Sequence, residues 1–125
     1  MKTLLPDTNI FSQIFKGNAQ LKTYIETTGA VICSTIYIEN IQGSKSNQEK
    51  RVIKKYLDNF SLLLIDTDTS QLAIELIDKY SNTHGLLLGD AQIAATALEN
   101  DLTILTYNVA DFKFIQNLKW EKPPI

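Results

Sequence analysis

The sequence contains a single cysteine and a single histidine, and each shortage excludes a kind of chemistry. Cys33 has no second cysteine with which to form an internal disulfide, which suits a reducing compartment. It follows the apolar residues 30–32, so we predict a small buried core residue rather than a catalytic thiol. His84 precedes a glycine at what we predict to be a helix end. No Ser–His or Cys–His arrangement therefore supports covalent catalysis.

Long apolar runs are also lacking. None approaches the roughly 20 residues that a membrane-spanning helix requires. The opening stretch MKTLLPDTN is interrupted too early, by Pro6 and Asp7, to resemble a signal peptide. We therefore expect a cytoplasmic protein without a membrane partner.

There is no excess of charge of either sign. The net charge is −2, which argues against a protein that simply coats nucleic acid. An acidic cluster that holds metal would, however, lower the net charge without repelling RNA. With 125 residues, of which 44% are hydrophobic, the chain fits one domain over residues 1–125 with a single core.

The basic residues are concentrated in one segment. Four of them recur at helical spacing, opposite an apolar side that contains Val52 and Ile53. They form either a solvated helix face or an edge that contacts RNA phosphates. The four residues are Lys50, Arg51, Lys54 and Lys55.

Predicted strands alternate with predicted helices along the chain. We expect strands at 2–5, 30–33, 62–65 and 102–105, with a last one near 114–118. Pro6 should end the first strand, and residues 86–88 are ambiguous between a turn and a strand. We expect helices through Phe11 and Phe15, then at 21–28, from Ser34 or Thr35 as cap to near Gly43, and at 48–58, 69–81 and 90–99. This alternation predicts a parallel sheet covered on both faces.

Four acidic residues follow apolar runs that we interpret as buried strands: Asp7, Glu39, Asp90 and Asp111. Each alone has a plain structural explanation as a helix cap, a surface residue or a turn former. However, the carboxyl ends of parallel strands meet in one crevice, so the four should lie together. Carboxylates this close repel one another unless a cation lies between them, and Mg²⁺ or Mn²⁺ prefers such oxygen ligands.

Three motifs carry a resemblance to a known family. They are D-T-N at 7–9, D-A-x-I-A-A-T-A-L at 90–98 and T-x-N-x-x-D-F at 106–112, with Glu39 between the first and second. In this order the chain resembles the PIN-domain family, and within it the VapC-like toxins of bacterial toxin–antitoxin pairs. The resemblance implies an α/β fold, a three-layer α/β/α domain with a central, mainly parallel sheet.

The same resemblance implies roles for individual residues. Asp7, Glu39, Asp90 and Asp111 would form the acidic cluster around Mg²⁺ or Mn²⁺. Asn9, Thr106 and Asn108 would support that cluster by hydrogen bonding. Tyr107 departs from the pattern, because relatives often carry an arginine there that could hold substrate phosphate.

The implied activity is that of a metal-dependent endoribonuclease. A divalent metal activates water and stabilises the phosphate charge, so no protein base is needed. The VapC-like resemblance also implies a cognate antitoxin and self-association into homodimers. Six apolar residues of the first two helices could line a groove for the antitoxin or a dimer contact, or could simply pack in the core: Phe11, Ile14, Phe15, Leu21, Tyr24 and Ile25.

Three other functions are compatible with parts of the sequence. The chain could be a PIN nuclease that acts in RNA maturation without an antitoxin, or a PIN-like fold that only binds RNA. It could also be a receiver-type phosphoacceptor domain, with Asp66 after residues 62–65 and a Lys122-Pro123 pair. The receiver hypothesis leaves Glu39 and Asp90 without a role, and the first strand lacks the adjacent pair of acids that it requires.

Overall fold

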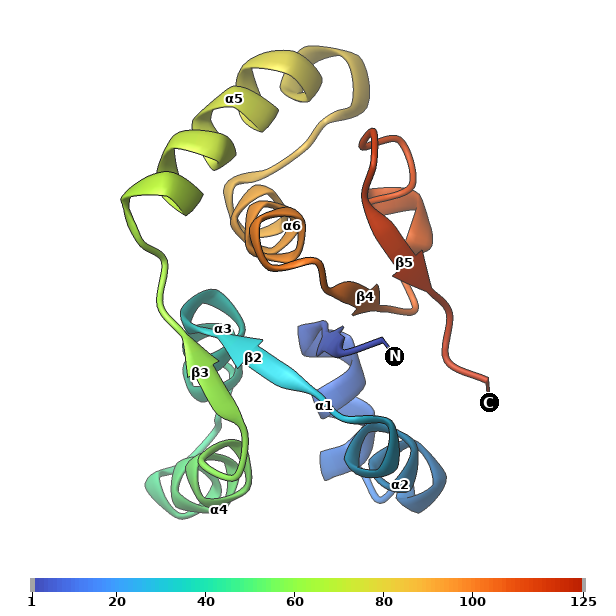
Figure 1. Ribbon diagram of the computed structural model, residues 1–125. Coiled ribbons are helices and arrows are strands. Elements are labelled where there is room, and N and C mark those ends of the chain that lie inside the picture. Colours follow the sequence, from blue (N-terminus) through green and yellow to red (C-terminus); the bar gives the residue numbers. More distant parts are fainter. Residues whose placement is uncertain (1, 125) are drawn as a thin grey trace.

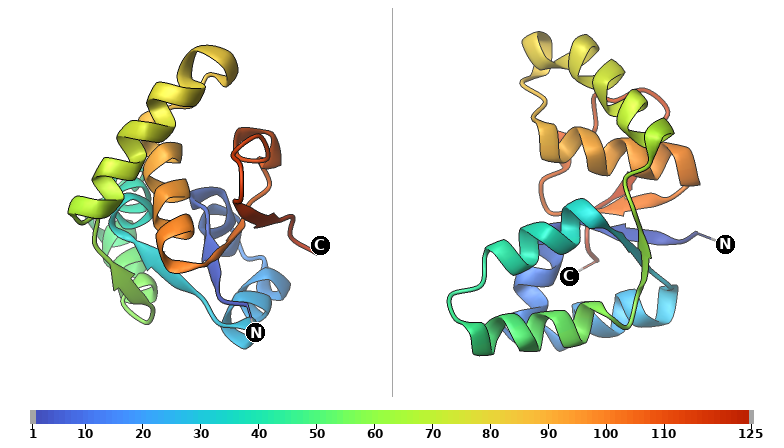
Figure 2. Two further views of the ribbon diagram at one scale, coloured as in Figure 1. Left: turned by 45° about the horizontal axis from the view of Figure 1, so that its top comes forward. Right: turned by 90° about the vertical axis from the view of Figure 1, so that its left-hand side faces the viewer.

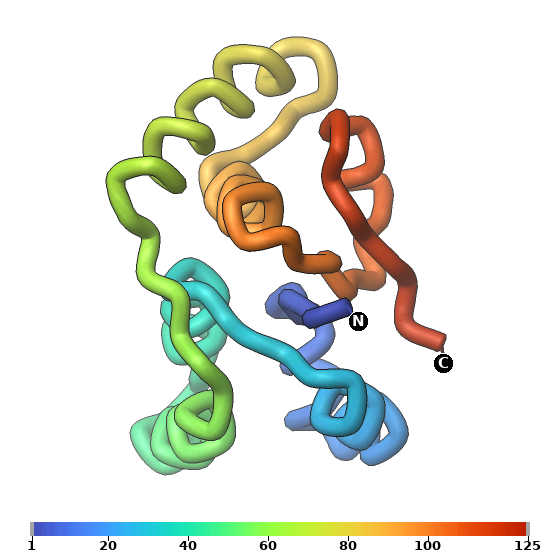
Figure 3. Tube along the Cα trace, in the orientation of Figure 1, coloured from blue at the N-terminus to red at the C-terminus, as the bar shows by residue number. Residues whose placement is uncertain are grey.

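The computed structural model describes residues 2–124, and five short parallel strands form their centre. β1 (Leu4–Pro6) pairs with β4 (Thr103–Leu105), which pairs on its other side with β5 (Lys119–Glu121). β2 (Val31–Cys33) pairs with β3 (Ser61–Leu63). One parallel bridge between Leu4 and Ala30 brings β2 beside β1, so the strand order across the molecule is β3-β2-β1-β4-β5. The strand at the amino end therefore lies in the middle, as the Cα trace shows (Figure 3).

Helices cover both faces of this sheet. They are α1 (Thr8–Phe15), α2 (Ala19–Thr28), α3 (Ser34–Gln42), α4 (Asn47–Leu57), α5 (Thr67–His84) and α6 (Leu88–Asn100). α5 and α6 lie on one side, α1, α2 and α4 on the other, and α3 between α4 and α6 (Figures 1 and 2). A 3-10 turn, η1 (Val109–Asp111), follows β4. This arrangement confirms the predicted α/β class and the three-layer α/β/α fold.

Small side chains allow α6 to pack closely in the core. Ala91, Ala94, Ala95 and Ala97 are all at most 1% exposed, and Ile93 is fully buried beside them. Burial of apolar surface is worth about 25 cal/mol per Å², so this helix contributes to stability through contact area despite its short side chains. The first turn of α6 carries Asp90, and its packing therefore fixes where that acid stands.

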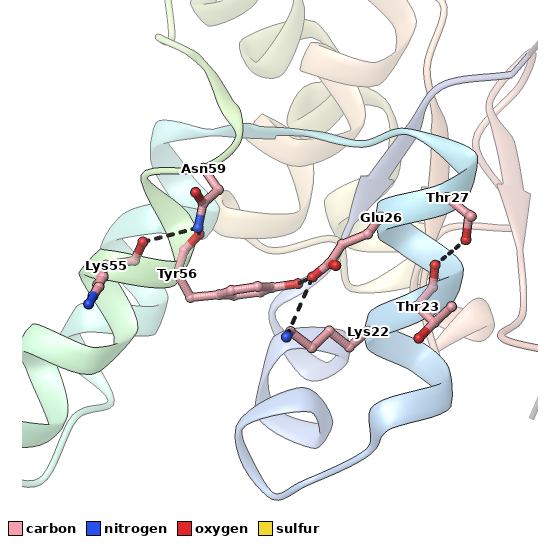
Figure 4. A network of polar contacts seen from close by, with 7 residues as sticks. All are labelled: Lys22, Thr23, Glu26, Thr27, Lys55, Tyr56 and Asn59. Atoms are coloured by element: carbon pink, nitrogen blue, oxygen red, sulfur yellow. Dashed lines mark hydrogen bonds and ion pairs between the residues drawn. The ribbon is translucent and has the colours of Figure 1, made fainter.

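An aromatic cluster joins α1, α2 and α4. The rings of Phe11, Phe15 and Phe60 each lie edge-on to Tyr56, or to one another, at centroid distances of 5.3–6.3 Å. The Tyr56 hydroxyl donates a hydrogen bond to Glu26 Oε2 at 2.7 Å, as Figure 4 shows. Burial and the neighbouring carboxylate raise the pKa of Tyr56 above its ordinary range, which keeps the hydroxyl a donor. These contacts hold α4 against α2.

Several predicted boundaries were wrong. Residues 114–118 form a turn, in which Asn117 has a positive φ of 70°, and the last strand is Lys119–Glu121 instead. The apolar pattern misled because Ile115 and Leu118 are buried from within a turn, whereas β5 is an edge strand with exposed residues. Likewise, β3 is mostly exposed and ends at Leu63, although its sequence predicted a longer strand, at 62–65.

Helix starts differed as well. The N-cap of α3 is Cys33, which makes no capping hydrogen bond, rather than Ser34 or Thr35. Ser34 is the first residue of the helix, and its hydroxyl accepts a hydrogen bond from the backbone N–H of Ile65 at 3.3 Å. α5 is longer than predicted at both ends, and Leu88, in the ambiguous stretch, is the first residue of α6. Pro6 is the last residue of β1 rather than the residue beyond it. Within residues 2–124 no helix is long and apolar enough to cross a membrane.

Candidate active site

All four predicted acids line one pocket of about 530 Å³. Asp7 follows β1 and caps α1, Glu39 projects from α3, Asp90 from the first turn of α6, and Asp111 from the end of η1. The structure therefore brings together residues that are more than a hundred positions apart in sequence. The lining residues are Asp7, Thr8, Asn9, Ser12, Glu39, Gln42, Gly43, Asp90, Asn108 and Asp111.

Strand ends account for only part of this convergence. Asp7 does follow a buried strand directly. Glu39, however, lies within α3, and no strand precedes Asp90, which enters the pocket from a helix start. The pocket thus depends on the packing of α3 and α6 as much as on the strand ends.

Asp7 is the most rigidly held of the four acids and is only 7% exposed. Its Oδ1 accepts a hydrogen bond from the backbone N–H of Thr8 at 2.8 Å. Its Oδ2 accepts one from the Thr106 hydroxyl at 2.9 Å and one from Asn9 Nδ2 at 3.3 Å. Burial raises the pKa of Asp7, helped by the charges of Glu39 and Asp111 and opposed by the hydrogen bonds from Thr8 and Thr106.

Thr106 links the supporting residues and is fully buried. While donating to Asp7, its hydroxyl oxygen accepts hydrogen bonds from Asn9 Nδ2 at 3.2 Å and from the backbone N–H of Asn108 at 3.0 Å. The structure thus places Asn9 and Thr106 directly against Asp7. Asn108 contributes its backbone to the network, and it also lines the pocket.

Thr8 was overlooked in the sequence, although it stands in the middle of the D-T-N motif. Its hydroxyl donates a hydrogen bond of 2.5 Å to Glu39 Oε1 and so connects two of the acids across the pocket. Ser12, Gln42 and Gly43 also line the pocket, and no motif singled them out. The only feature of the sequence that could have pointed to Thr8 is its position next to Asp7.

The acids influence one another strongly. The pKa of Asp90 is raised to about 7, first by burial and then by the negative charges of Asp7, Asp111 and Glu39. A site that raises a carboxyl pKa this far favours either a proton or a cation. Four carboxylates are the donor type that Mg²⁺ and Mn²⁺ prefer, so the residues present fit such an ion in kind.

The geometry of the four carboxylates is open. Among the residues that the structure describes, no three His, Cys, Asp or Glu side chains stand close enough together to hold a metal ion. The acids surround the pocket, and their side chains would have to turn inward to share one ion.

A larger groove of about 820 Å³ continues from the acid pocket between α1 and α4. The two share Thr8, Ser12, Glu39 and Gly43. α4 contributes Gln48, Glu49, Val52 and Ile53 to the groove wall, and Val52 is 59% exposed there. Further along, the lining includes Phe15, Lys16, Asn40, Lys45 and Ser46.

The predicted RNA-contacting residues lie outside both hollows. The exposed side chains of Lys50, Arg51, Lys54 and Lys55 line neither the acid pocket nor the groove, because Val52 and Ile53 occupy the inner side of α4. We call these four residues the basic face of α4. The structure does not bring this face into the site.

The apolar residues of α1 and α2 are mainly core. Phe11, Ile14, Leu21 and Ile25 are buried, which favours core packing, one of the two alternatives considered for them. Ile25 also lines a separate hollow, together with Lys22 and Tyr56. Of the two partly exposed residues, Phe15 lines the groove beside α4. Tyr24 instead donates a hydrogen bond to Glu121 Oε1 at 2.9 Å, on β5.

Asp66 caps a helix, and this role argues against the receiver hypothesis, in which it would be the phosphoacceptor. Its Oδ1 caps α5 by accepting hydrogen bonds from the backbone N–H and the hydroxyl of Thr69, at 2.8 and 2.9 Å. These bonds lower the pKa of Asp66, which lies outside the pocket that the four acids line.

Cys33 is buried as expected, and burial raises the pKa of its thiol.

Comparison with known proteins identifies the class to which this fold and site belong. Residues 4–115 match the family model described as PIN domain, and the chain belongs to the PIN-domain family. No curated protein matches the sequence.

Solved structures agree with the family assignment over nearly the whole chain. A chain of a toxin–antitoxin complex from Klebsiella pneumoniae is 26% identical, with a TM-score of 0.77 over 94% of this chain and 95% of that one. A chain of VapBC2 from Rickettsia felis, bound to a DNA fragment from its promoter, is 22% identical, with a TM-score of 0.81 over 97% and 98%. A chain of DNA-bound VapBC from Salmonella typhimurium is 22% identical, with a TM-score of 0.80 over 98% of both chains. The chain therefore shares its fold with chains of VapBC and other toxin–antitoxin complexes over nearly its whole length.

Proposed function

We propose that this protein is a Mg²⁺- or Mn²⁺-dependent endoribonuclease that hydrolyses RNA phosphodiester bonds, and that it is the toxin of a toxin–antitoxin pair. The observation that carries the proposal is the meeting of four carboxylates in one pocket of a PIN fold. The raised pKa of Asp90 supports it, because a site that disfavours uncompensated negative charge favours a bound cation.

In this proposal Asp7, Glu39, Asp90 and Asp111 hold the metal and are the catalytic residues. A divalent ion there supplies an activated water and stabilises charge on the phosphate. Thr106 and Asn9 fix the orientation of Asp7 through their hydrogen bonds to its Oδ2. Asn108 supports them by donating its backbone N–H to the Thr106 hydroxyl. The largely buried position of Asp7 keeps water from competing for its oxygens.

The RNA chain extends well beyond one phosphate, and we propose that the basic face of α4 contacts it outside the pocket. Its four exposed cations can pair with phosphates without any sequence preference. Lys16 and Lys45, which line the groove itself, would add to this attraction.

The partners we propose are a cognate antitoxin and a second copy of the chain, in the cytoplasm. Similarity to chains of toxin–antitoxin complexes supports the first. The groove beside α4 is a suitable seat for an antitoxin segment, because the partly exposed Phe15 and the exposed Val52 line a hollow that opens into the acid pocket. A segment lying there would block access to the site.

Light scattering of the purified protein tests the homodimer, which a monomeric mass would refute.

The central experiment is cleavage of a pool of cellular RNA by antitoxin-free protein. We expect cleavage at discrete sites in Mn²⁺, none in EDTA, and a loss of at least about a thousandfold in rate for Asp7→Asn. Asp66→Asn is a matched control, because it removes an equivalent charge outside the pocket. Cleavage by Asp7→Asn at the wild-type rate would refute the proposed site. No cleavage by folded, metal-loaded protein would instead favour a PIN fold that only binds RNA.

A further inference from the structure

The Glu39 carboxylate is constrained at both of its oxygens. Oε1 accepts the 2.5 Å hydrogen bond from the Thr8 hydroxyl at the start of α1. Oε2 lies against Gly89 in the first turn of α6, where a Cβ built on the glycine would stand only 2.9 Å away. Carbon and oxygen atoms do not approach this closely without repulsion. The side chain of Glu39 therefore bridges the space between two helix starts.

The backbone does not explain why residue 89 is glycine. Gly17, Gly29 and Gly85 have positive φ angles that favour glycine, whereas Gly89 lies in a regular helix without one. Glycine costs about 1 kcal/mol relative to alanine inside a helix, so α6 alone would favour alanine. The close approach of Glu39 Oε2 is the contact that a Cβ at residue 89 would disturb, because the carboxylate would have to move away from the first turn of α6.

We propose that Thr8 and Gly89 are positioning residues for Glu39: Thr8 holds one carboxylate oxygen by a hydrogen bond, and Gly89 makes room for the other. Neither residue touches the reacting phosphate in this account. Their effect is to hold the Glu39 carboxylate against the first turn of α6, the turn that also carries Asp90, so that a cation at Asp90 would find Glu39 already positioned on that side of the pocket. The inference deepens the proposed function and rests on it, because Glu39 must be a metal ligand for its position to matter.

The first test replaces Gly89 by alanine and measures Mn²⁺ affinity by titration, together with thermal unfolding in EDTA. We expect Gly89→Ala to weaken Mn²⁺ binding by about 10- to 100-fold, the usual effect of losing an outer-shell contact. The metal-free protein should melt at the wild-type temperature or above it, since alanine is the better helix former. A variant that binds Mn²⁺ as the wild type does would overturn the role of Gly89.

A double-mutant cycle asks whether the effect passes through Glu39. In a Glu39→Ala background the added methyl group meets no carboxylate, so Gly89→Ala should change Mn²⁺ affinity less than about twofold. An equal loss in both backgrounds would refute the inference, because the methyl group would then act on something else. Glu39→Asp shortens the side chain and should restore part of the affinity lost in Gly89→Ala.

Thr8 is tested by a pair of variants of similar size. Thr8→Val removes the hydroxyl and should weaken Mn²⁺ binding, whereas Thr8→Ser keeps the donor and should bind within about threefold of wild type. Equal affinities for the two variants would overturn the role of Thr8. If the wild type itself bound no Mn²⁺ while Gly89→Ala folded normally, the proposed metal site would fail, and this inference with it.

Discussion

At the scale of single residues, the raised pKa of the Asp90 carboxyl group should make the stability of the protein depend on pH. Its pKa is about 7 in the folded protein, against an ordinary value of 3.8. Between about pH 4 and pH 7 the folded state therefore binds a proton that the unfolded state has lost. Rising pH favours the unfolded state across this window, and the raised pKa of Asp7 acts in the same direction.

We therefore predict that the metal-free protein becomes less stable as pH rises from about 4 to about 7. Asp90→Asn cannot ionise, so its stability should fall less over the same range. Thermal unfolding in EDTA at a series of pH values measures both slopes. Parallel curves for the two proteins would show that Asp90 titrates normally, contrary to the burial and repulsion that raise its pKa.

The residue scale also shows how far the sequence could predict the site. Asp7, Asp90 and Asp111 were identifiable because each stands in a motif, and Glu39 because it lies between two of them after an apolar run; the structure places all four in one pocket. Thr8 and Gly89 could not be identified from the sequence. The Thr8 hydroxyl and the missing Cβ of Gly89 matter only because α3 places the Glu39 carboxylate between them in the folded protein. Contacts between distant elements leave no local pattern in a sequence.

At the scale of elements, prediction succeeded where burial and periodicity coincide. α2 and α6 have caps or alanine-rich faces, and their positions were predicted to within about two residues at most ends. The bounds of β3 were shifted and β5 was predicted in the wrong place, because both are exposed edge strands in which apolar alternation is absent or misplaced. The turn around Ile115 has the apolar residues expected of a strand, because they are buried in the core. Burial alone therefore does not distinguish a turn from a strand.

α4 has two sides whose functions we expect to separate. Lys50→Glu combined with Lys54→Glu should weaken RNA binding roughly tenfold at low salt and reduce its salt dependence. Val52→Glu, on the groove side, should leave RNA binding nearly unchanged but release an antitoxin that copurifies with the wild type. Fluorescence anisotropy with an RNA oligonucleotide and copurification measure the two effects.

A charge-matched control for the lysine pair is Lys113→Glu with Lys122→Glu, two exposed residues outside the acid pocket and the groove. If this control weakened RNA binding equally, net charge rather than the basic face of α4 would be responsible. If Val52→Glu kept its partner, the antitoxin would have to bind elsewhere.

At the scale of the whole molecule, the acid pocket joins elements that meet only in the folded state. β1, α3, α6 and η1 each supply one acid, so a bound ion would connect all of them. A ligand that binds only the folded state stabilises it by about 2.7 kcal/mol at a hundred times its dissociation constant. We predict that millimolar Mn²⁺ raises the melting temperature of the wild type by several degrees.

Asp7→Asn should abolish most of this shift, whereas Asp66→Asn should keep it. Differential scanning fluorimetry with and without EDTA makes the comparison. A wild-type melting temperature unaffected by Mn²⁺ would count against a shared ion. The assignment of residues 1–125 to one nuclease domain stays a prediction at this scale, with residues 4–115 matched to the family.

The strand order has a consequence for the protein while it is still being made. β1 is synthesised before its partner β4 and the edge strand β5, from which most of the described helices separate it along the chain. Until then Asp7 lacks the Thr106 hydroxyl that orients it, and Asp111 does not yet exist. A nascent chain that has not reached β4 and η1 therefore has no complete acid pocket, and any activity of this site begins only after those segments have been translated.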